Sequence, residues 1–345
     1  MVCLLLEEKT VSLWKLKGSV GKLLGNTTTD SRSHYQRLKR WLQEGGQGKG
    51  LWVEMLRAAM SLLSEESSCL ILDGSSWKWG GKEYHFLTLS LLYRGVSVPI
   101  FWIELSRLGI SSQWHRRWLL RMACKLFSLK GKVLLADREY IGSEWFALLE
   151  EREISFVIRL RKGNYEQQIE QKGKKIAKLE RKARAKVGKV VWQSFTLQGH
   201  CYSFVLKAYR ERSGKIALLR FISSLPADKA LQYYMDRYRI EPMFRHLKSN
   251  GFHLESLHVQ KEYKVQLMMA AVVLAYCLSV VYGLKKYKRA IAVKKHGSRE
   301  MSVFRWGLDK WQNHLQTFVH FLDKLSHYYK LCNSHENDLL KLNVP

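Results

Sequence analysis

Three acidic side chains occupy positions from which carboxylates could act together on a phosphodiester. Asp73 follows the apolar run CLIL, Asp137 follows VLLA, and Glu241 lies in the basic stretch YYMDRYRIEPMFRHLK. Short apolar runs predict buried strands, and side chains at the carboxyl ends of neighbouring strands meet at one edge of an α/β sheet. Grouped carboxylates repel one another unless divalent cations lie between their oxygens. The pattern therefore predicts a two-metal site for phosphoryl transfer, with two Mg²⁺ ions, or Mn²⁺ in their place.

Each of these acids also has an ordinary explanation. An aspartate after a strand is commonly a turn or helix-capping residue, and Glu241 could simply pair with an arginine four residues away. The spacing around Glu241 is more specific, because a continuous helix would place Tyr234, Arg237, Glu241 and Lys248 on one face. Pro242 directly after the acid predicts a break or a new first helical turn near Glu241.

These residues resemble the Y-x2-R-x3-E-x6-K signature of bacterial insertion-sequence transposases of the DDE class, the IS-four family. ILDGSS at Asp73 and ADREYIGSEW at Asp137 resemble the motifs of that family's first and second acids. The resemblance covers roughly residues 35–285 and implies a ribonuclease-H-like catalytic fold. It further implies that Asp73, Asp137 and Glu241 are catalytic and bind two Mg²⁺ ions. It also implies that Tyr234, Arg237 and Lys248 contact phosphates.

Three further residues are candidates for contact with DNA. Arg138 could position DNA or brace the end of its strand, and Arg245 lies one helical turn after Glu241. Some members of the resembled family flip a base onto an aromatic residue of a β-rich insertion, and Trp192 in VVWQSF is the candidate for that role. A tryptophan in a strand is, however, more often a core residue.

The charge of the chain indicates a polyanionic partner. The 345 residues include 58 Lys and Arg against 30 Asp and Glu, a formal net charge of +28. Nucleic acid, an anionic membrane and an acidic protein all remain possible on charge alone. Twelve tryptophans and sixteen tyrosines favour nucleic acid, because aromatic side chains among basic ones suit a surface that stacks on bases and holds phosphates. The resemblance implies that the partner is double-stranded DNA.

Hydrophobic periodicity predicts an α/β fold. Residues 33–63 are typical of two helices separated by GGQGKG, and residues 69–105 of three antiparallel strands. The ranges 111–126 and 142–151 indicate helices, whereas KVLLAD and SFVIRL indicate short buried strands. The resulting order, βββαβαβ, is that of the ribonuclease-H-like core that the resemblance implies.

The composition changes after residue 161. Residues 161–189 contain eleven Lys or Arg against three Glu, which predicts an exposed basic excursion, either a groove for the DNA backbone or only a solvated face. VVWQSFTL, CYSFVLKAY and IALLRFISSL alternate as strands of a small β insertion that leads back to the main sheet. Asp228 is the expected N-cap of a helix that runs through Lys248.

We expect five segments along the chain. They are a helical DNA-binding module at 1–66, the two parts of the catalytic core at 67–161 and 225–283, a basic and β-rich insertion at 162–224, and a basic helical region at 284–345. Holding two transposon ends together requires at least two subunits, so we expect a homodimer, and the resemblance implies that the last region is its interface.

One apolar run could cross a membrane. Val265 to Tyr282 spans 18 residues, near the lower limit for a membrane helix, but Gln266, Tyr276 and Ser279 within it favour a buried helix of an α/β core. A membrane is therefore not expected as a partner. The six cysteines lie far apart without a CxxC pair, which favours a reducing compartment, and we expect the protein in the cytoplasm.

The expected function is that of a DNA transposase that binds terminal inverted repeats, cuts DNA at the ends and joins 3′ hydroxyls to target DNA. An inactive, repressor-like DNA-binding relative and a metal-dependent nuclease without strand transfer are the alternatives. Only 72 residues precede Asp73, which is short for the end-recognition domain of longer relatives and keeps the inactive alternative open.

Overall fold

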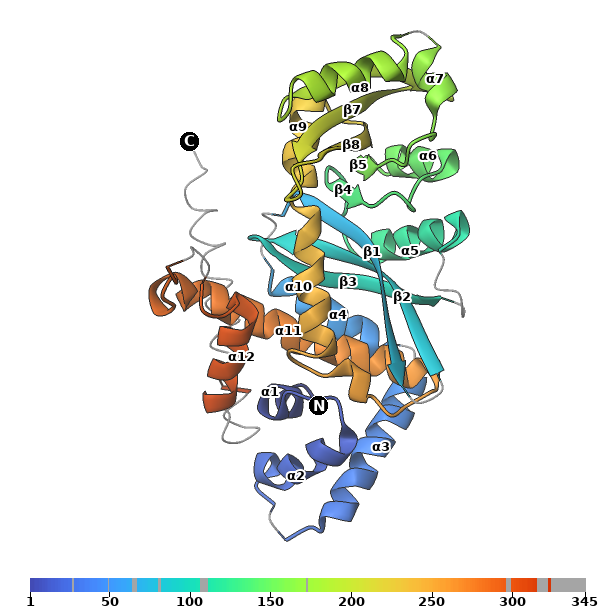
Figure 1. Cartoon of the computed structure of the whole chain (residues 1–345). Coiled ribbons are helices and arrows are strands. Elements are labelled where there is room, and N and C mark those ends of the chain that lie inside the picture. Colours follow the sequence, from blue (N-terminus) through green and yellow to red (C-terminus); the bar gives the residue numbers. More distant parts are fainter. Residues whose placement is uncertain are drawn as a thin grey trace, which may run out of the picture. The chain divides into compact units, whose positions relative to one another are not determined.

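The computed structural model describes residues 1–26, 28–48, 50–63, 67–79, 82–105, 111–171, 173–295, 299–314 and 322–323. The chain forms two compact units (Figure 1). The helical unit comprises Met1–Glu65, Trp77–Lys82 and Met243–Pro345, and the sheet unit comprises Glu66–Ser76 and Glu83–Pro242. All three predicted acids lie in the sheet unit.

An eight-stranded mixed sheet has the order β3-β2-β1-β4-β5-β8-β7-β6. Its strands are β1 (Cys69–Trp79), β2 (Lys82–Tyr93), β3 (Val96–Leu105), β4 (Val133–Ala136), β5 (Ser155–Arg159), β6 (Val190–Leu197), β7 (His200–Arg210) and β8 (Ile216–Ser223). Strands β1, β4 and β5 are parallel, and β8 returns antiparallel to β5. The predicted α/β class and the order of the first five strands are confirmed, and the β-rich insertion continues the same sheet. The ribonuclease-H-like assignment stays an expectation.

The short central strand β4 is fully buried, because both of its faces are covered. Two helices follow the predicted order, α5 (Gln113–Leu126) after β3 and α6 (Ser143–Glu151) after β4. Ser112 begins α5 with a capping box, in which the Ser112 hydroxyl accepts from the backbone N–H of His115 while the His115 ring accepts from the backbone N–H of Ser112. This end of α5 is therefore firmly fixed.

The predicted basic excursion is helical. Helices α7 (Glu166–Glu170) and α8 (Ile176–Ala185) pack on β6, β7 and β8. Ile176, Leu179 and Ala183 of α8 are buried, while its lysines and arginines are exposed, which confirms the exposed basic surface. The run of charges concealed three apolar positions at helical spacing, so the sequence analysis missed both helices.

The segment that carries the signature residues is divided. It consists of α9 (Ala227–Tyr234), a 3₁₀ turn at Arg237–Arg239 and α10 (Ile240–Lys248). The expected single helix and the expected N-cap at Asp228 are therefore wrong, since Pro226 is the N-cap and Asp228 lies in the first turn. The predicted new turn near Glu241 is confirmed, and Pro242 is tolerated there because N–H groups in a first turn have no intrahelical acceptor.

The helical unit surrounds one long apolar helix. It contains α1 (Val2–Glu8), α2 (Leu13–Leu24), α3 (Ser31–Gln47), α4 (Leu51–Ser61), the 3₁₀ turn Leu254–Ser256, α11 (Glu262–Ala290) and α12 (Val303–His314). Helix α11 packs against α12, α4, α3 and α1, and 83% of its most apolar window is buried. It is long and apolar enough to cross a membrane, but its burial is that of a core helix. The two predicted helices within 33–63 are confirmed, whereas α1 and α2 were not predicted. Of the predicted helical region 284–345, residues 315–321 and 324–345 lie outside the described residues.

Candidate active site

Asp73 and Asp137 lie at the same edge of the sheet unit. Parallel pairing of β1 with β4 sets Leu72 opposite Ala136, so each aspartate is the residue that follows. Asp137 directly follows β4, as predicted, whereas β1 continues beyond Asp73 to Trp79. Because β4 ends at Ala136, the carboxylate of Asp73 is open toward neighbouring elements rather than covered by the next strand.

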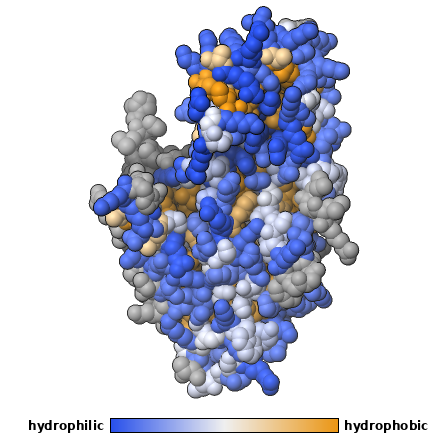
Figure 2. Space-filling model, viewed as in Figure 1, coloured by the Kyte–Doolittle hydropathy of each residue, from blue (hydrophilic) through white to orange (hydrophobic). Residues whose placement is uncertain are grey.

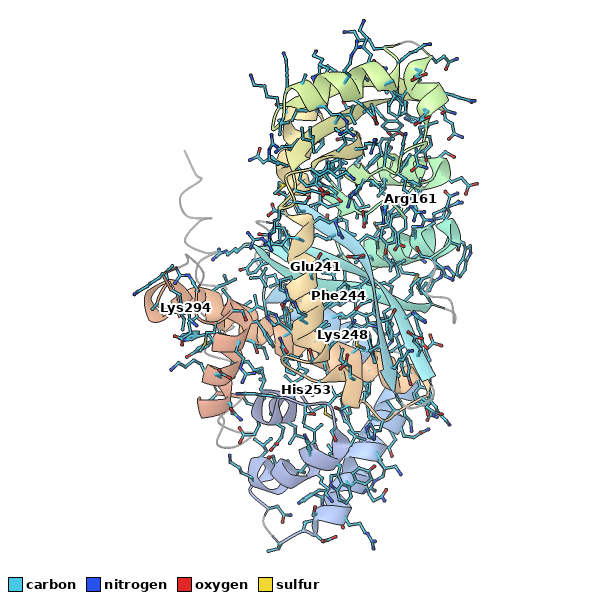
Figure 3. The ribbon with its side chains drawn as sticks, in the orientation of Figure 1. Arg161, Glu241, Phe244, Lys248, His253 and Lys294 are labelled. Atoms are coloured by element: carbon cyan, nitrogen blue, oxygen red, sulfur yellow. The ribbon has the colours of Figure 1, made fainter. Side chains whose placement is uncertain are left out.

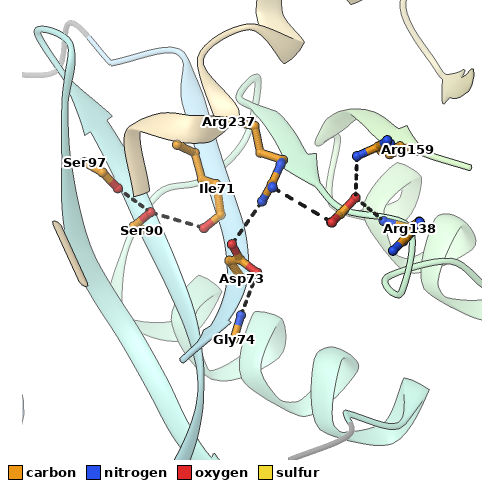
Figure 4. Close-up of polar contacts among 9 residues, drawn as sticks. Ile71, Asp73, Gly74, Ser90, Ser97, Arg138, Arg159 and Arg237 are labelled. Carbon is orange, nitrogen blue, oxygen red and sulfur yellow. Dashed lines mark hydrogen bonds and ion pairs between the residues drawn. The ribbon is translucent and has the colours of Figure 1, made fainter. Parts of the chain in front are cut away.

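Arg237 joins the two aspartates. Its Nη1 donates to Oδ2 of Asp73 at 3.0 Å, and its Nη2 lies 3.9 Å from Oδ2 of Asp137 (Figure 4). On the far side of Asp137, Nη1 of Arg159 lies 4.0 Å from Oδ1. The guanidinium of Arg237 is mostly buried, with 16% of its side chain exposed. A delocalised cation therefore occupies the space between the two carboxylates.

Backbone amides hold both carboxylates in place. The N–H of Gly74 donates to Oδ1 of Asp73 at 2.9 Å, and the N–H of Arg138 donates to Oδ1 of Asp137 at 2.8 Å. Each aspartate thus bonds the amide that follows it, a common local arrangement for this side chain. The contacts fix one oxygen of each carboxylate and leave the other directed at Arg237 (Figure 4).

Burial and charge oppose each other at Asp73. Burial raises the pKa of the Asp73 carboxyl, the guanidinium of Arg237 and the Gly74 amide lower it, and the nearby Asp137 raises it again. Burial lowers the pKa of Arg237, but Asp73, Tyr234 and Asp137 together raise it above its usual value. The cluster therefore favours a positive charge at the position that Arg237 occupies.

Tyr140 is a buried neighbour that the sequence analysis missed. Its side chain is fully buried, and its hydroxyl has no hydrogen-bond partner of good geometry among the described residues. A Cβ on Gly74 would lie 3.4 Å from this hydroxyl, so the tyrosine reaches the backbone beside Asp73. Burial, the charge of Asp73 and a hydrogen bond to Glu139 raise its pKa. The hydroxyl is therefore protonated beside the aspartate pair.

Glu241 does not join the two aspartates. Its side chain is exposed in the first turn of α10 (Figure 3), and no contact places it beside Asp73 or Asp137. Within the part of the chain that the structure describes, no three His, Cys, Asp or Glu side chains form a group that could hold a metal ion. Among the described residues, the structure thus brings together two of the three predicted acids, Asp73 and Asp137.

A family model described as the transposase DDE domain matches residues 64–278, more than half of the chain and the whole segment from Asp73 to Glu241. The chain belongs to the DDE-domain transposases. Among solved structures, a piggyBac transposase in a synaptic complex with hairpin DNA is 12% identical, with 81% of this chain and 54% of that chain covered and a TM-score of 0.42. This transposase thus spans about half the length of that relative. No curated protein matches its sequence.

The other signature residues of the transposase lie in differing surroundings. Tyr234 packs on Phe221 with ring centroids 4.4 Å apart, and burial raises its pKa although Arg237 is close. Lys248, the last residue of α10, is half-buried, and burial lowers its pKa. Arg245 is exposed on the same helix. Tyr234 is placed beside the aspartate pair through Arg237.

Arg138 and Trp192 both present exposed side chains. Arg138 contributes its backbone amide to the transposase site, while its side chain is exposed. Trp192 is 56% exposed on β6, the last strand of the sheet. The expectation of a core tryptophan is therefore wrong, because Trp192 points to the face of β6 opposite the buried Val191.

Two residues of the transposase site were not predicted, and the sequence carried a signal for one of them. Arg159 ends β5, and the parallel pairing of Ala136 with Ile158 places it level with Asp137. That position follows from the strand-end rule that located the aspartates. The burial of Tyr140 had no such signal, since DREYIG follows a strand without any helical or strand periodicity.

Proposed function

We propose that this transposase binds the terminal inverted repeats of its own insertion sequence, cleaves DNA at the ends and joins the freed 3′ hydroxyls to target DNA. The observation that carries the proposal is the pair Asp73 and Asp137 on adjoining parallel strands with Arg237 between them. We further propose that the chain is of the IS-four type, on the Tyr234, Arg237, Glu241 and Lys248 spacing, with a ribonuclease-H-like core.

The chemistry of the pair fits divalent cations. Carboxylate oxygens are the hard ligands that Mg²⁺ and Mn²⁺ prefer, and the burial of Asp73 disfavours its charge unless a cation is near. We propose two Mg²⁺ ions, with Mn²⁺ as a substitute, held by Asp73, Asp137 and Glu241. Bound there, such ions supply activation of the attacking oxygen and stabilisation of the leaving oxygen. To hold such ions with the two aspartates, Glu241 in the first turn of α10 would have to approach them.

The chain's own residues orient the DNA. Arg237, once released from the carboxylates, presents a planar fork that suits bidentate contact with a phosphate. The amides of Gly74 and Arg138 keep the two carboxylates at the sheet edge during this exchange. We assign further phosphate or base contacts to Tyr234, Lys248, Arg138, Arg245 and Trp192.

The wider surface suits a duplex. Hydrophilic side chains project from α7 and α8 at the top of the view in Figure 2, and Arg161 begins this basic segment in Figure 3. We propose that the exposed lysines and arginines of 161–189 contact the backbone of double-stranded DNA. A homodimer would hold two ends, and we place the protein in the cytoplasm.

Cleavage of the natural DNA tests the proposal. The substrate is a plasmid carrying the coding sequence with its own flanking DNA, incubated with purified protein and Mg²⁺. We expect Asp73→Asn and Asp137→Asn each to reduce cleavage about a hundredfold or more, because the loss of a carboxylate ligand removes several kcal/mol of stabilisation. The matched control is Asp228→Asn, which changes an exposed aspartate in the first turn of α9.

Each outcome distinguishes one alternative. Equal cleavage by Asp73→Asn and the unchanged protein would refute the assigned role of the pair, and equal cleavage by Glu241→Gln would remove Glu241 from the site. Cleavage without joining would indicate a nuclease. Binding of the flanking DNA without any cleavage would indicate an inactive DNA-binding relative.

A further inference from the structure

Helix α5 carries an exposed row of aromatic and basic side chains. Trp114 is 66% exposed and Trp118 39% exposed, although both side chains are large and apolar. Residues at this helical spacing share one face. The α5 stripe consists of Trp114, Arg117, Trp118, Arg121 and Lys125.

The stripe is not needed to hold α5 on the sheet unit. The opposite face of the helix buries Leu119, Leu120 and Ala123 completely. Trp114 and Trp118 lie nearly parallel, with ring centroids 6.5 Å apart and an interplanar angle of 23°. Trp114 meets the ring of His115 edge-on at 5.3 Å, and Trp118 lies 6.2 Å from the ring of Phe101 at an interplanar angle of 46°. Two indoles therefore present faces to the solvent.

The charge of the stripe is positive. Arg117 pairs with Glu144, but no acidic side chain within the described ranges pairs with Arg121 or Lys125. Aromatic faces alternating with unpaired cations match a nucleic acid single strand, whose bases stack on aromatic rings while its phosphates bind lysine and arginine. A duplex does not match as well, because its bases are already stacked on one another.

The inner side of α5 packs near the candidate active site. Nη1 of Arg116 donates to the carbonyl of Ile141 at 2.9 Å, and a Cβ on Gly142 would overlap the side chain of Gln113. The first turn of α5 thus packs on the loop that follows Asp137, and Figure 1 shows α5 next to α6, which leaves that loop. The exposed stripe lies on the side of the helix away from the buried Arg116.

We propose that the α5 stripe binds single-stranded DNA, with bases stacked on Trp114 and Trp118 and phosphates bound by Arg121 and Lys125. The inference rests on the proposed function, because it takes the strand to be the one that the aspartates cut. It assigns to the transposase a second DNA contact that reads no base sequence.

Binding of an oligonucleotide tests the stripe separately from catalysis. The probe is fluorescein-labelled oligothymidine, titrated by fluorescence anisotropy with the full chain in the absence of divalent cations. We expect Trp114→Ala and Trp118→Ala each to weaken binding between about fivefold and a hundredfold, since stacking on an aromatic ring contributes this much per base. Trp14→Ala is the matched control, because Trp14 is 68% exposed and also has a cation, Nζ of Lys17, 3.0 Å from its ring centroid.

Further variants keep the test decisive if an alanine variant fails to fold. Trp118→Phe retains a stacking face and should keep most of the affinity, whereas Arg121→Gln with Lys125→Gln should lower the salt dependence of binding. Unchanged affinity for oligothymidine in all of these variants would overturn the proposal. If that result came with an altered oligomeric state in sedimentation, the stripe would instead be a protein interface. If Asp73→Asn loses cleavage but still binds oligothymidine, the role of the aspartates and the role of the α5 stripe are tested independently of each other.

Discussion

Arg237 shows at the scale of single residues why a cation belongs between Asp73 and Asp137. Burial disfavours the charge on Asp73, and Asp137 adds repulsion, so the two carboxylates require a positive group close to both. A buried ion pair gains little net stability, because desolvation offsets most of its attraction. The ion pairs of Arg237 therefore contribute little to the stability of the fold. They show instead that the two carboxylates lie at a spacing that a cation can bridge.

Tyr140→Phe should separate stability from activity. The Tyr140 hydroxyl is buried without a good partner, so its removal should leave the free energy of unfolding unchanged or raise it by about 1 kcal/mol. We expect cleavage to fall about tenfold, because the hydroxyl next to Gly74 is placed to donate to Asp73 or its ligands in the active complex. Thermal unfolding and plasmid cleavage in Mg²⁺ measure the two effects.

A second buried tyrosine provides the comparison. The hydroxyl of Tyr276 has a partner, Nδ1 of His246 at 3.5 Å, in the helical unit. Tyr276→Phe should therefore lose up to about 1 kcal/mol of stability and keep its cleavage rate. If Tyr140→Phe cleaves DNA as fast as the unchanged protein, the hydroxyl has no part in the reaction.

The sequence located some residues of the site and not others for a physical reason. Asp73 and Asp137 follow apolar runs, and strand ends are positions that local patterning predicts. The ion pair of Arg237 with Asp73 joins residues that are 164 positions apart, so no local pattern indicates it. Glu241 was expected to reach them from the helix that follows the sheet, and the 3₁₀ turn at Arg237–Arg239 interrupts the segment that carries it.

At the scale of whole elements, the hydrophobic pattern of the sequence predicted helices and strands correctly where apolar residues dominate. The buried strands β4 and β5 and the helix α11 were predicted because their apolar runs admit few alternatives. Helix α8 was missed because charge outnumbers its three buried positions, although Ile176, Leu179 and Ala183 recur at helical spacing. Composition alone is therefore a poor guide in basic segments, where the few apolar positions decide the structure.

The packing of α12 on α11 depends on glycine. A Cβ on Gly307 would lie 1.9 Å from the carbonyl oxygen of Ser279, and a Cβ on Gly283 would lie 2.3 Å from that of Val303. We expect Gly307→Ala to destabilise the helical unit by more than about 2 kcal/mol, because backbone atoms cannot move aside as flexible side chains can. Urea denaturation followed by circular dichroism measures the change.

Gly18→Ala is the control for the same substitution. Gly18 lies within α2 of the same unit, and a Cβ there would meet nothing within 4 Å. Alanine should raise stability by about 0.5 to 1 kcal/mol, the usual gain over glycine inside a helix. Equal effects of the two substitutions would show that α11 and α12 do not approach as closely as their glycines indicate.

At the scale of the whole molecule, the net charge of +28 predicts strong but salt-dependent binding of DNA. The net charge follows from the composition, but the distribution of that charge over the surface follows from the fold. The apolar positions of α8 are buried on β6, β7 and β8, and this burial leaves the lysines and arginines of α8 on its exposed face. Bound cations are released for each phosphate that the protein neutralises, so the logarithm of affinity falls linearly with the logarithm of salt concentration.

Two lysines of α8 test whether this surface contacts the duplex. Lys178 and Lys182 are exposed one turn apart, and Lys178→Gln with Lys182→Gln should reduce the salt slope by up to about 2, near 0.9 for each lost phosphate contact. The double variant Lys130→Gln and Arg152→Gln removes the same charge just before β4 and β5, at the sheet edge opposite the two aspartates. If only total charge mattered, both double variants would shift the slope equally. A reduction confined to the α8 variant, measured by anisotropy on duplex DNA over a series of salt concentrations, would instead place phosphates on α8.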